Sequence, residues 1–500
     1  MRKLKGYLLS HKLEIVWVTM LLGGFIYFLY GNTRESIWLD ESVSIAYANR
    51  SYKDILQLIT YDSHPPLYYL FMRIFRVLFG DSIFVYRTLS ALGTTALAAL
   101  GIGPVRRACG AKAGFVFSFL VIITPASLIY SQEIRMYTWA AFFVAGSCIY
   151  GYLSAAVDEK KDWAKFALFS LAAAYTHFYA LLSVVIINVL VFIWVILLRK
   201  KEKIKIHLQA ALFMTFLYTP AIIHLVRLII DGETISWIPK VTRKVIENTL
   251  SYPLEYKFLF PESVNNYNTF KYIMVFVFLG VLIALIKRKA SVRLIILSLS
   301  VYSLTLLVEV LASYSIQPLL IPRYMIPCLG LLLLAVAYAI SQVPKYVLPL
   351  VFVLLLYLIS PKIQFIEQNR FNGPMNEVVT FFDNKLNEDD IFIHTDSLTA
   401  GPFSYYFKDN RHLWYRLEYS KCKTKILYNG SPYTNVLIGF DLKTFSKGHR
   451  NVWLVSHSKD NEIYKLLINS GELKLTDYSR DFSLPNSWFA VSIHKVELNH

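Results

Sequence analysis

The sequence predicts an all-α polytopic membrane domain of about eleven helices, followed by a small α/β domain outside the membrane. The 500 residues are 55% hydrophobic and only 17% charged, and the mean hydropathy is +0.45. A soluble chain is roughly 45–50% apolar and about 25% charged. Apolar runs of about 18 residues or more recur from Leu13 to Ser360, and the composition after residue 361 is that of a soluble domain. Water-soluble enzymes and disordered chains are therefore excluded.

Apolar length and the positions of short basic loops place the spans. We predict spans at 13–30, 82–103, 113–130, 137–156, 164–178, 179–198, 207–229, 269–286, 294–312, 324–341 and 346–361. The run from Trp163 to Leu198 is too long for one helix, and we break it at Thr176-His177-Phe178. With this break the basic loops all fall on one side. The N-terminus is then cytoplasmic and the C-terminus is extracytoplasmic, in a multi-pass protein of the cell membrane.

The positive charge of the chain is concentrated in its membrane part. The formal net charge is +17, and residues 362–500 hold 17 Lys and Arg against 16 Asp and Glu. Nearly all of the excess therefore lies in the first 361 residues. This pattern is typical of loops that face anionic membrane lipids, and we expect no nucleic-acid partner.

Two domains follow from these patterns. Residues 1–361 are predicted to form the transmembrane catalytic domain, with an outer loop at 31–81. In that loop, Ser42 to Tyr61 and Pro65 to Phe79 are predicted amphipathic helices lying along the membrane surface. Residues 362–500 are predicted to form the extracytoplasmic α/β domain. Its expected helices are Met375 to Leu386 and Asn461 to Asn469, and its expected strands are Ile391 to His394, Val436 to Phe440, Val452 to Val455 and Trp488 to His494.

Four polar clusters are predicted at the outer membrane face, where charge must be paired, hydrated or functional. The first follows span one, the second opens the second amphipathic helix, the third lies between spans three and four, and the fourth opens span ten. Their sequences are Trp38-Leu39-Asp40-Glu41, Asp62-Ser63-His64-Pro65-Pro66-Leu67-Tyr68-Tyr69, Tyr130-Ser131-Gln132-Glu133-Ile134-Arg135-Met136-Tyr137 and Pro322-Arg323-Tyr324. His177 and Glu309 lie near the outer ends of their own spans.

These clusters combine carboxylates, suited to act as a base or hold a metal, with cations suited to hold a phosphate beside the lipid. That combination favours glycosyl transfer. A sugar on a polyprenyl phosphate has a lipid-bound anion as its leaving group, which needs Arg or His partners. The acceptor hydroxyl needs a carboxylate to take its proton. A single displacement would invert the anomeric centre.

The order of these motifs resembles the multi-spanning GT-C glycosyltransferases, in the branch of the family 39 protein O-mannosyltransferases and the bacterial aminoarabinose transferases. The resemblance is strongest over roughly residues 30–140. It implies an extracytoplasmic active site, a polyprenyl-phosphate-linked sugar donor, and Asp40 at the catalytic-base position. The chain departs from the aminoarabinose transferases before the paired prolines, where they have Glu-Lys and this sequence has Ser63-His64. Their phosphate lysine and metal-binding acid therefore do not carry over.

The candidate site residues fall into three groups. Asp40 and Glu41 are the catalytic candidates. His64, Arg135, Arg323 and Tyr324 are the candidates for binding the donor phosphate. Gln132, Glu133, Tyr137 and His177 are substrate-binding or structural candidates. A divalent metal is left open, with Glu41 and His64 as its candidate ligands.

Several of these residues have a structural alternative. Asp40 would cap a helix that starts at Ser42. Glu133 and Arg135 would pair to close a tight turn, and Arg323 would be a snorkelling residue at a helix end. For His177 and Glu309 the structural role is favoured.

Two other function classes also need many spans and cations near a lipid phosphate. A transporter or flippase of lipid-linked sugars would favour interrupted spans at mid-membrane and internal repeats. A glycan polymerase or ligase would favour a large late loop. In this sequence the polar groups gather at the outer membrane face. The leading hypothesis is therefore a transferase of the cell envelope that acts on a lipid, glycan or protein acceptor.

Overall fold

The computed structural model describes residues 12–59, 62, 64–157, 159–230, 238–254, 267–416, 433–439, 441–449, 451–458 and 460–498. The chain forms two compact units. Unit 1 comprises Met1–Tyr30, Asp62–Tyr68 and Arg87–Ile366, and unit 2 comprises Gly31–Tyr61, Tyr69–Tyr86 and Glu367–His500. Ser63 and the basic residues before Lys12 lie outside the described residues.

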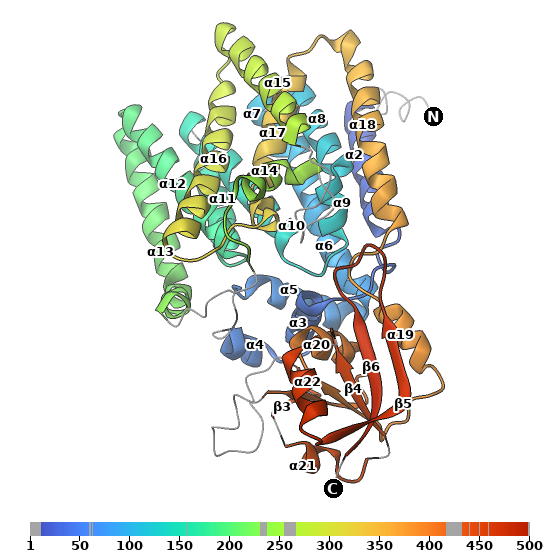
Figure 1. The fold of residues 1–500 in the computed structure, drawn as a ribbon. Helices are drawn as coiled ribbons and strands as arrows, with labels where there is room; N and C mark the ends of the chain where they lie inside the picture. Colours follow the sequence, from blue (N-terminus) through green and yellow to red (C-terminus); the bar gives the residue numbers. More distant parts are fainter. Residues whose placement is uncertain are drawn as a thin grey trace, which may run out of the picture. The chain divides into compact units, whose positions relative to one another are not determined.

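Unit 1 is helical (Figure 1). Its elements are α2 (Lys12–Leu29), α6 (Ile83–Ala99, whose first turn belongs to unit 2), η2 (Gly101–Val105), α7 (Arg106–Cys109), α8 (Ala111–Ile123), α9 (Pro125–Ser131), α10 (Tyr137–Ala156), α11 (Lys160–Ala174), α12 (Phe178–Leu197), α13 (Lys201–Ile230), α14 (Arg243–Ser251), η3 (Tyr252–Leu254), α15 (Tyr267–Ile286), α16 (Val292–Ser315), η4 (Pro322–Cys328), α17 (Leu329–Ser341), η5 (Lys345–Val347) and α18 (Leu348–Gln368, whose last two residues belong to unit 2).

The predicted spans coincide with these helices. Each of the eleven predicted ranges is helical over most of its length. Among the described residues, seven helices are long and apolar enough to cross a membrane, and α8 with α9, bent by 61°, would make an eighth; Leu13–Leu29 is a shorter apolar helix. The chain is a multi-pass membrane protein with an all-α membrane domain.

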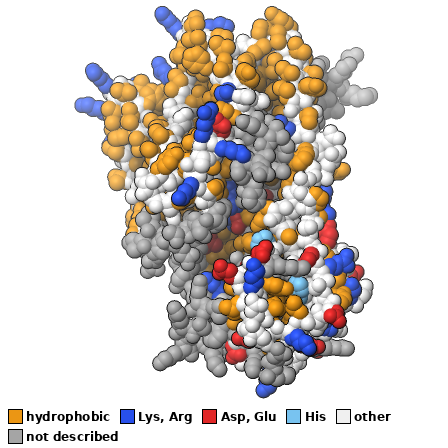
Figure 2. Space-filling view, viewed as in Figure 1, with side chains coloured by type: hydrophobic (Ala, Val, Ile, Leu, Met, Phe, Trp, Pro, Cys, Tyr) orange, Lys and Arg blue, Asp and Glu red, His pale blue; other side chains and the backbone are white. Residues whose placement is uncertain are grey.

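The outward surfaces of these helices suit a lipid environment. Figure 2 shows hydrophobic side chains over much of the helical surface in this view. On α18, Leu350 is 68% exposed and Tyr357 is 75% exposed, and on α15, Tyr272 is 75% exposed. Such surfaces would be costly in water and are favourable against acyl chains.

The predicted break between two neighbouring spans is confirmed. Helix α11 ends at Ala174 and α12 begins at Phe178. His177 is the N-cap of α12, and its Nδ1 accepts a hydrogen bond from the backbone N–H of Tyr179 at 3.1 Å. The imidazole thus satisfies one of the amides that every helix start leaves unpaired, which explains why the apolar run is interrupted here.

The outer loop contains three helices, all with residues in unit 2. They are α3 (Leu39–Ala48), α4 (Tyr52–Leu58) and α5 (Leu67–Phe79). The single helix predicted from Ser42 to Tyr61 was therefore wrong. Ser51 divides it, because its side chain accepts a hydrogen bond from the backbone N–H of Asp54 at 3.1 Å and so starts a new helix.

The C-terminal part of unit 2 is an α/β fold built on a six-stranded sheet of order β3-β2-β1-β4-β6-β5. Its helices are α19 (Met375–Phe382), α20 (Ser397–Tyr406), α21 (Leu442–Ser446) and α22 (Glu462–Asn469); its strands are β1 (Ile391–His394), β2 (Arg411–Tyr415), β3 (Val436–Gly439), β4 (Val452–Ser456), β5 (Leu473–Phe482) and β6 (Val491–Leu498). Strands β1 to β4 run parallel, and β6 pairs antiparallel with both β4 and β5.

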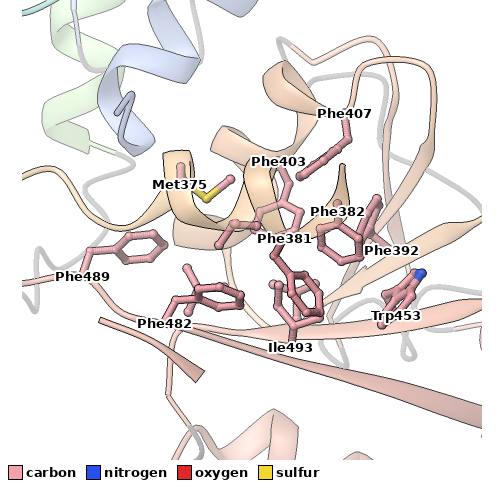
Figure 3. Close-up of a cluster of buried hydrophobic side chains, with 13 residues drawn as sticks. Met375, Phe381, Phe382, Phe392, Phe403, Phe407, Trp453, Phe482, Phe489 and Ile493 are labelled. Atoms are coloured by element: carbon pink, nitrogen blue, oxygen red, sulfur yellow. The ribbon is translucent and has the colours of Figure 1, made fainter. Parts of the chain in front are cut away.

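The two faces of this sheet are covered by separate hydrophobic clusters. One contains Phe381 and Phe382 of α19, Phe403 of α20, and Phe392 and Trp453 of the sheet (Figure 3). The other packs α21 and α22 against the opposite face. Strands β1 and β4 are buried along their whole length, as central parallel strands are when helices cover both faces.

The outer loop is bonded to the C-terminal residues within unit 2. The carboxylate of Glu35 accepts hydrogen bonds from the backbone N–H groups of Phe371 and Asn372 at 3.0–3.1 Å. The backbone N–H of Ile37 donates to the Tyr406 hydroxyl at 3.1 Å. Segments more than 330 positions apart in the sequence therefore form one body. The predicted division into domains at residue 361 falls inside α18 and stays a prediction.

Two buried histidines predict a pH-dependent stability for this sheet. His394 Nε2 lies 3.0 Å from His412 Nδ1, and His412 Nε2 lies 2.9 Å from the Phe407 carbonyl oxygen. Because the carbonyl only accepts, Nε2 of His412 carries a proton, and Nδ1 is free to accept from His394. Burial lowers the pKa of His412 to about 4 and that of His394 well below its usual value.

Acidification should therefore destabilise the sheet. The unfolded histidines titrate near 6.5, so their neutral folded form contributes stability above about pH 6.5 that is lost as the pH falls toward 4. For His412 alone the full loss is about 3 kcal/mol. We expect the urea midpoint for proteolytic protection of residues 391–415 to fall between pH 7 and pH 5. His449→Gln, in the same domain, should show the same fall, and a midpoint that does not change would refute the argument.

Candidate active site

A buried polar centre lies in unit 1 where several helices begin or end. The backbone turn between α9 and α10 supplies Glu133 and Arg135, the residues before α5 supply Asp62 and His64, and the N-cap of α12 supplies His177. The start of η4 supplies Arg323 and Tyr324. The structure therefore brings together residues from four of the sequence motifs and spans.

Asp62, His64 and Arg135 form a hydrogen-bonded chain. Arg135 donates from a terminal guanidinium nitrogen to His64 Nε2 at 3.0 Å, and His64 Nδ1 lies 3.1 Å from the carboxylate of Asp62. A guanidinium has no acceptor, so His64 Nε2 must accept and its proton must lie on Nδ1, facing Asp62. In this arrangement His64 is a neutral ring that orients Arg135. The sequence placed Asp62 beside His64 but did not assign it this role; the Asp-x-His spacing, typical of an Asx turn, was its only signal.

His177 presents a buried donor with no partner. Its Nδ1 accepts from the Tyr179 amide, so the proton of the neutral ring lies on Nε2. The residue is 2% exposed, and within the described part of the chain Nε2 has no hydrogen-bond partner. A buried donor without a partner destabilises the folded state by about 1–3 kcal/mol. Its presence in a polar centre indicates that the Nε2–H group of His177 donates to a bound ligand.

Aromatic rings and two arginines surround this donor. The His177 ring centroid lies 5.6 Å from that of His64, 5.4 Å from that of Tyr137 and 6.0 Å from that of Tyr324. The guanidinium of Arg323 lies 5.9 Å from the Tyr324 ring centroid. Arg135 and Arg323 are only 3% and 7% exposed, and both act electrostatically on His177. Two buried cations and one neutral donor therefore converge on the same place.

Gln132 and Glu133 differ in their surroundings. The side-chain amide of Gln132 donates to the backbone carbonyls of Phe28 and Tyr30 at 3.1 and 2.8 Å, so it fixes the turn to the end of α2. The backbone carbonyl oxygen of Glu133 accepts a hydrogen bond from the backbone N–H of Arg135 at 2.8 Å, and this bond closes the turn. Its carboxylate lies near enough to Tyr130 and Tyr137 to act on them electrostatically.

Asp40 and Glu41 belong to unit 2, in the first turn of α3. The helix begins at Leu39 and its N-cap is Trp38, so the alternative in which Asp40 caps a helix starting at Ser42 was wrong. Asp40 is half-buried, and its backbone carbonyl accepts the Ser44 hydroxyl at 3.0 Å. Glu41 is fully buried and accepts from the side-chain amide of Asn372 at 3.3 Å. Asp40 is thus the more accessible of the two carboxylates.

The residues named as metal ligands do not have the arrangement of a metal site. Both ring nitrogens of His64 are hydrogen-bonded, Nδ1 to the carboxylate of Asp62 and Nε2 to the guanidinium of Arg135, so neither is available to a metal ion. Across the described ranges there is no group of three or more His, Cys, Asp or Glu residues placed to hold a metal ion.

Glu309 is a second buried group without a partner. It lies on α16, is 2% exposed, and neither carboxylate oxygen has a hydrogen-bond partner among the residues that the structure describes. The carboxyl group of Glu309 is close enough to Tyr179, Tyr252 and Tyr302 to interact with them electrostatically. An unpaired carboxyl in a membrane helix is costly, so the purely structural role favoured from the sequence does not explain why it is there.

Two solved structures share the fold of this chain, and both are of ArnT from Cupriavidus metallidurans. The apo structure matches with a TM-score of 0.57 at 10% identity, over 96% of this chain and 98% of that chain. The structure bound to undecaprenyl phosphate matches with a TM-score of 0.59 at 10% identity, over 97% and 98%. The expected GT-C resemblance is confirmed at the level of the fold.

No protein-family model matches the chain, and no curated protein matches it. The roles of individual residues therefore rest on the geometry described above.

Proposed function

We propose that the protein is an inverting glycosyltransferase that moves a sugar from a polyprenyl-phosphate-linked donor to an acceptor on the outer side of the membrane. The observation that carries this proposal is the convergence of Arg135, Arg323 and the unpartnered Nε2–H of His177 in a buried centre at the ends of membrane helices. The likeness of the fold to an ArnT structure bound to undecaprenyl phosphate supports it.

The donor phosphate would lie among these three groups. Each arginine offers parallel N–H donors that match phosphate oxygens, and His177 adds a neutral donor whose bonding is incomplete without a ligand. We assign His64 a positioning role, because its Nε2 accepts from Arg135 and Asp62 fixes its tautomer. The phosphate would thus be held by cations whose side chains are already fixed in place, which lowers the entropy cost of binding.

The proposed reaction is a single displacement. The acceptor hydroxyl oxygen attacks the anomeric carbon of the donor sugar, and its proton passes to the carboxylate of Asp40. The bond between the anomeric carbon and the phosphate oxygen breaks, and the lipid phosphate leaves with the electron pair. Negative charge therefore grows on the phosphate in the transition state, where Arg135, Arg323 and His177 would stabilise it most strongly.

The test is a transfer assay with the purified protein in lipid nanodiscs. The protein is given a polyprenyl-phosphate-linked donor whose sugar is radiolabelled. Envelope lipids, glycans and peptides are supplied as acceptors. We expect labelled sugar on an acceptor together with an equal amount of free polyprenyl phosphate. A flippase would move the donor between leaflets of a vesicle without releasing lipid phosphate, and that result would refute the proposal.

The topology can be tested separately. Because the basic loops fall on one side only with eleven spans, we propose that residues 199–205 and 287–293 are cytoplasmic and that residues 362–500 are extracytoplasmic. A cysteine introduced at the exposed Ser470 should react with an impermeant maleimide on intact cells, whereas one at the exposed Lys289 should react only after lysis. The opposite labelling pattern would contradict this orientation.

A further inference from the structure

Unit 2 contains a pocket that is separate from the proposed phosphate site. Its volume is about 240 Å³, and it lies between helix α3, the end of helix α20, Asp81 and residues 433–435. Ile45 and Ala46 of α3 give it an apolar side, and the tyrosines Tyr405 and Tyr433 line it elsewhere. The size is slightly below the roughly 300–1,000 Å³ of typical small-molecule pockets, so it suits one small ligand unit rather than a long chain.

Several polar groups of the pocket are fixed by the protein itself. The hydroxyl oxygens of Ser42 and Tyr433 lie 3.0 Å apart, and the carboxylate of Asp81 accepts the Tyr86 hydroxyl at 2.7 Å. The side-chain nitrogen of Asn435 donates to the backbone carbonyls of Ser404 and Lys408 at 3.0 and 3.3 Å. These bonds hold the side chains in one orientation before any ligand binds, which favours binding.

Other polar groups of the pocket are open to solvent and can be reached by a ligand. Asn49, Lys408 and Thr434 are exposed and have no side-chain hydrogen-bond partner among the described residues, and the carbonyl oxygen of the Asn435 side chain likewise has none there. The four groups include donors and acceptors on different sides of the pocket. A ligand that satisfies them must itself carry several groups able to donate and accept.

The lining excludes most ligand classes. Asp81 and Lys408 carry opposite charges, and no arginine is among the described residues that line the pocket, so an anion such as phosphate would meet one lysine beside a carboxylate, which disfavours it. An acyl chain would leave the polar groups unsatisfied. Tyrosine rings beside amide, hydroxyl and carboxylate groups suit a neutral sugar, whose hydroxyls both donate and accept and whose C–H surface packs on aromatic rings.

The position on α3 relates this pocket to the proposed catalytic base. Ser42, Ile45, Ala46 and Asn49 follow the 3.6-residue period along one face of the helix. Asp40 lies roughly half a turn from that face, so the pocket and Asp40 are on opposite sides of α3, about one helix diameter or ~10 Å apart. A sugar in the pocket is therefore not the sugar whose hydroxyl reacts.

We propose that this pocket binds a neutral monosaccharide unit of a glycan acceptor, at a distance from the hydroxyl that is glycosylated. The proposal rests on the transferase function above and specifies its acceptor as a glycan-bearing molecule. Binding energy from such a remote unit lowers the acceptor KM and holds the reacting part near the base. The bond-forming step itself is unchanged.

The test measures sugar binding without any transfer. The full chain in lipid nanodiscs, free of maltoside detergent, is titrated with methyl glycosides of glucose, galactose, mannose and N-acetylglucosamine, and saturation-transfer NMR detects binding. We expect at least one glycoside to bind, and the Asn49→Ala/Lys408→Ala variant to weaken it about tenfold, since two hydrogen bonds are lost. Thr434→Trp, which fills the pocket, should abolish the signal.

Matched variants separate this site from the catalytic one. Asn469→Ala/Lys447→Ala removes the same residue types from exposed positions elsewhere in unit 2 and should bind the glycosides as the wild type does. Asp40→Asn should also retain glycoside binding, because Asp40 is on the opposite face of α3. If no glycoside binds the wild type, or if the pocket variants bind normally, the pocket proposal fails even with transfer intact. If glycosides bind in the pocket but no donor is consumed, the proposed transferase function fails instead.

Discussion

Asp40→Asn is expected to lower the rate of sugar transfer by 10²- to 10⁴-fold, the usual cost of removing a general base. The amide keeps the size and shape of the carboxylate but cannot take the acceptor proton. Donor binding should stay within a few-fold of wild type, because the phosphate ligands lie on other elements. Single-turnover transfer from a radiolabelled polyprenyl-phosphate sugar, measured alongside donor binding, distinguishes the two effects.

The fold should tolerate this substitution. Asp40 is not the N-cap of α3, and the hydrogen bond to Ser44 uses its backbone carbonyl, which the substitution leaves in place. The change removes a favourable interaction of the carboxylate with the helix dipole, worth about 0.3–1 kcal/mol. Asp54→Asn, in the first turn of the neighbouring α4, carries the same chemical change and should transfer sugar normally. Turnover of Asp40→Asn near the wild-type rate would move the base to Glu41 or Glu133.

The membrane helices were predictable from the sequence because the bilayer imposes a simple rule. A spanning segment must be long, apolar and internally hydrogen-bonded, so run length together with the short basic loops located the spans. The break at His177 was also visible, since two spans are needed to keep the basic loops on one side. The tautomer of His177 was not predictable, because it depends on a single backbone N–H, that of Tyr179, which only the three-dimensional structure places.

The α/β sheet was only partly predictable. Strand β1 (Ile391–His394) is a short, wholly buried apolar run, and it was located correctly. Strands β2 (Arg411–Tyr415) and β5 (Leu473–Phe482) were missed. The first carries Arg and His among its five residues, and the second is a largely exposed edge strand with charged residues along it. Neither has the apolar pattern that indicates a strand.

The association of the outer loop with the C-terminal residues was not predictable either. It depends on Glu35 binding two backbone amides 336 and 337 positions away, and periodicity carries no information about partners so distant. The pocket beside α3 has the same origin, because its described walls come from four separated segments of the chain. Local patterns therefore gave the candidate catalytic residues, whereas the candidate acceptor site required the tertiary structure.

Arg323→Lys and Arg135→Lys are expected to raise the KM for the lipid-linked donor by roughly ten- to a hundred-fold, although both keep the positive charge. Lysine cannot form the two parallel hydrogen bonds that a guanidinium makes with phosphate, and a hydrogen bond to a charged group is worth about 1.5–3 kcal/mol. Both side chains are buried, so water cannot replace the lost bond cheaply. Arg135→Lys also disturbs the contact with His64, and its effect should be the larger of the two.

A fall in kcat should accompany the rise in KM, because the leaving phosphate gains negative charge in the transition state and the guanidinium bonds strengthen there. Steady-state kinetics with donor and acceptor varied separately measure the two parameters. Arg243→Lys on α14 is the control, since its side chain is 90% exposed and pairs with Glu247, and it should leave both parameters unchanged. The assignment fails if Arg323→Lys and Arg135→Lys retain normal donor kinetics while the acceptor KM rises, because the arginines would then serve the acceptor and the phosphate would bind elsewhere.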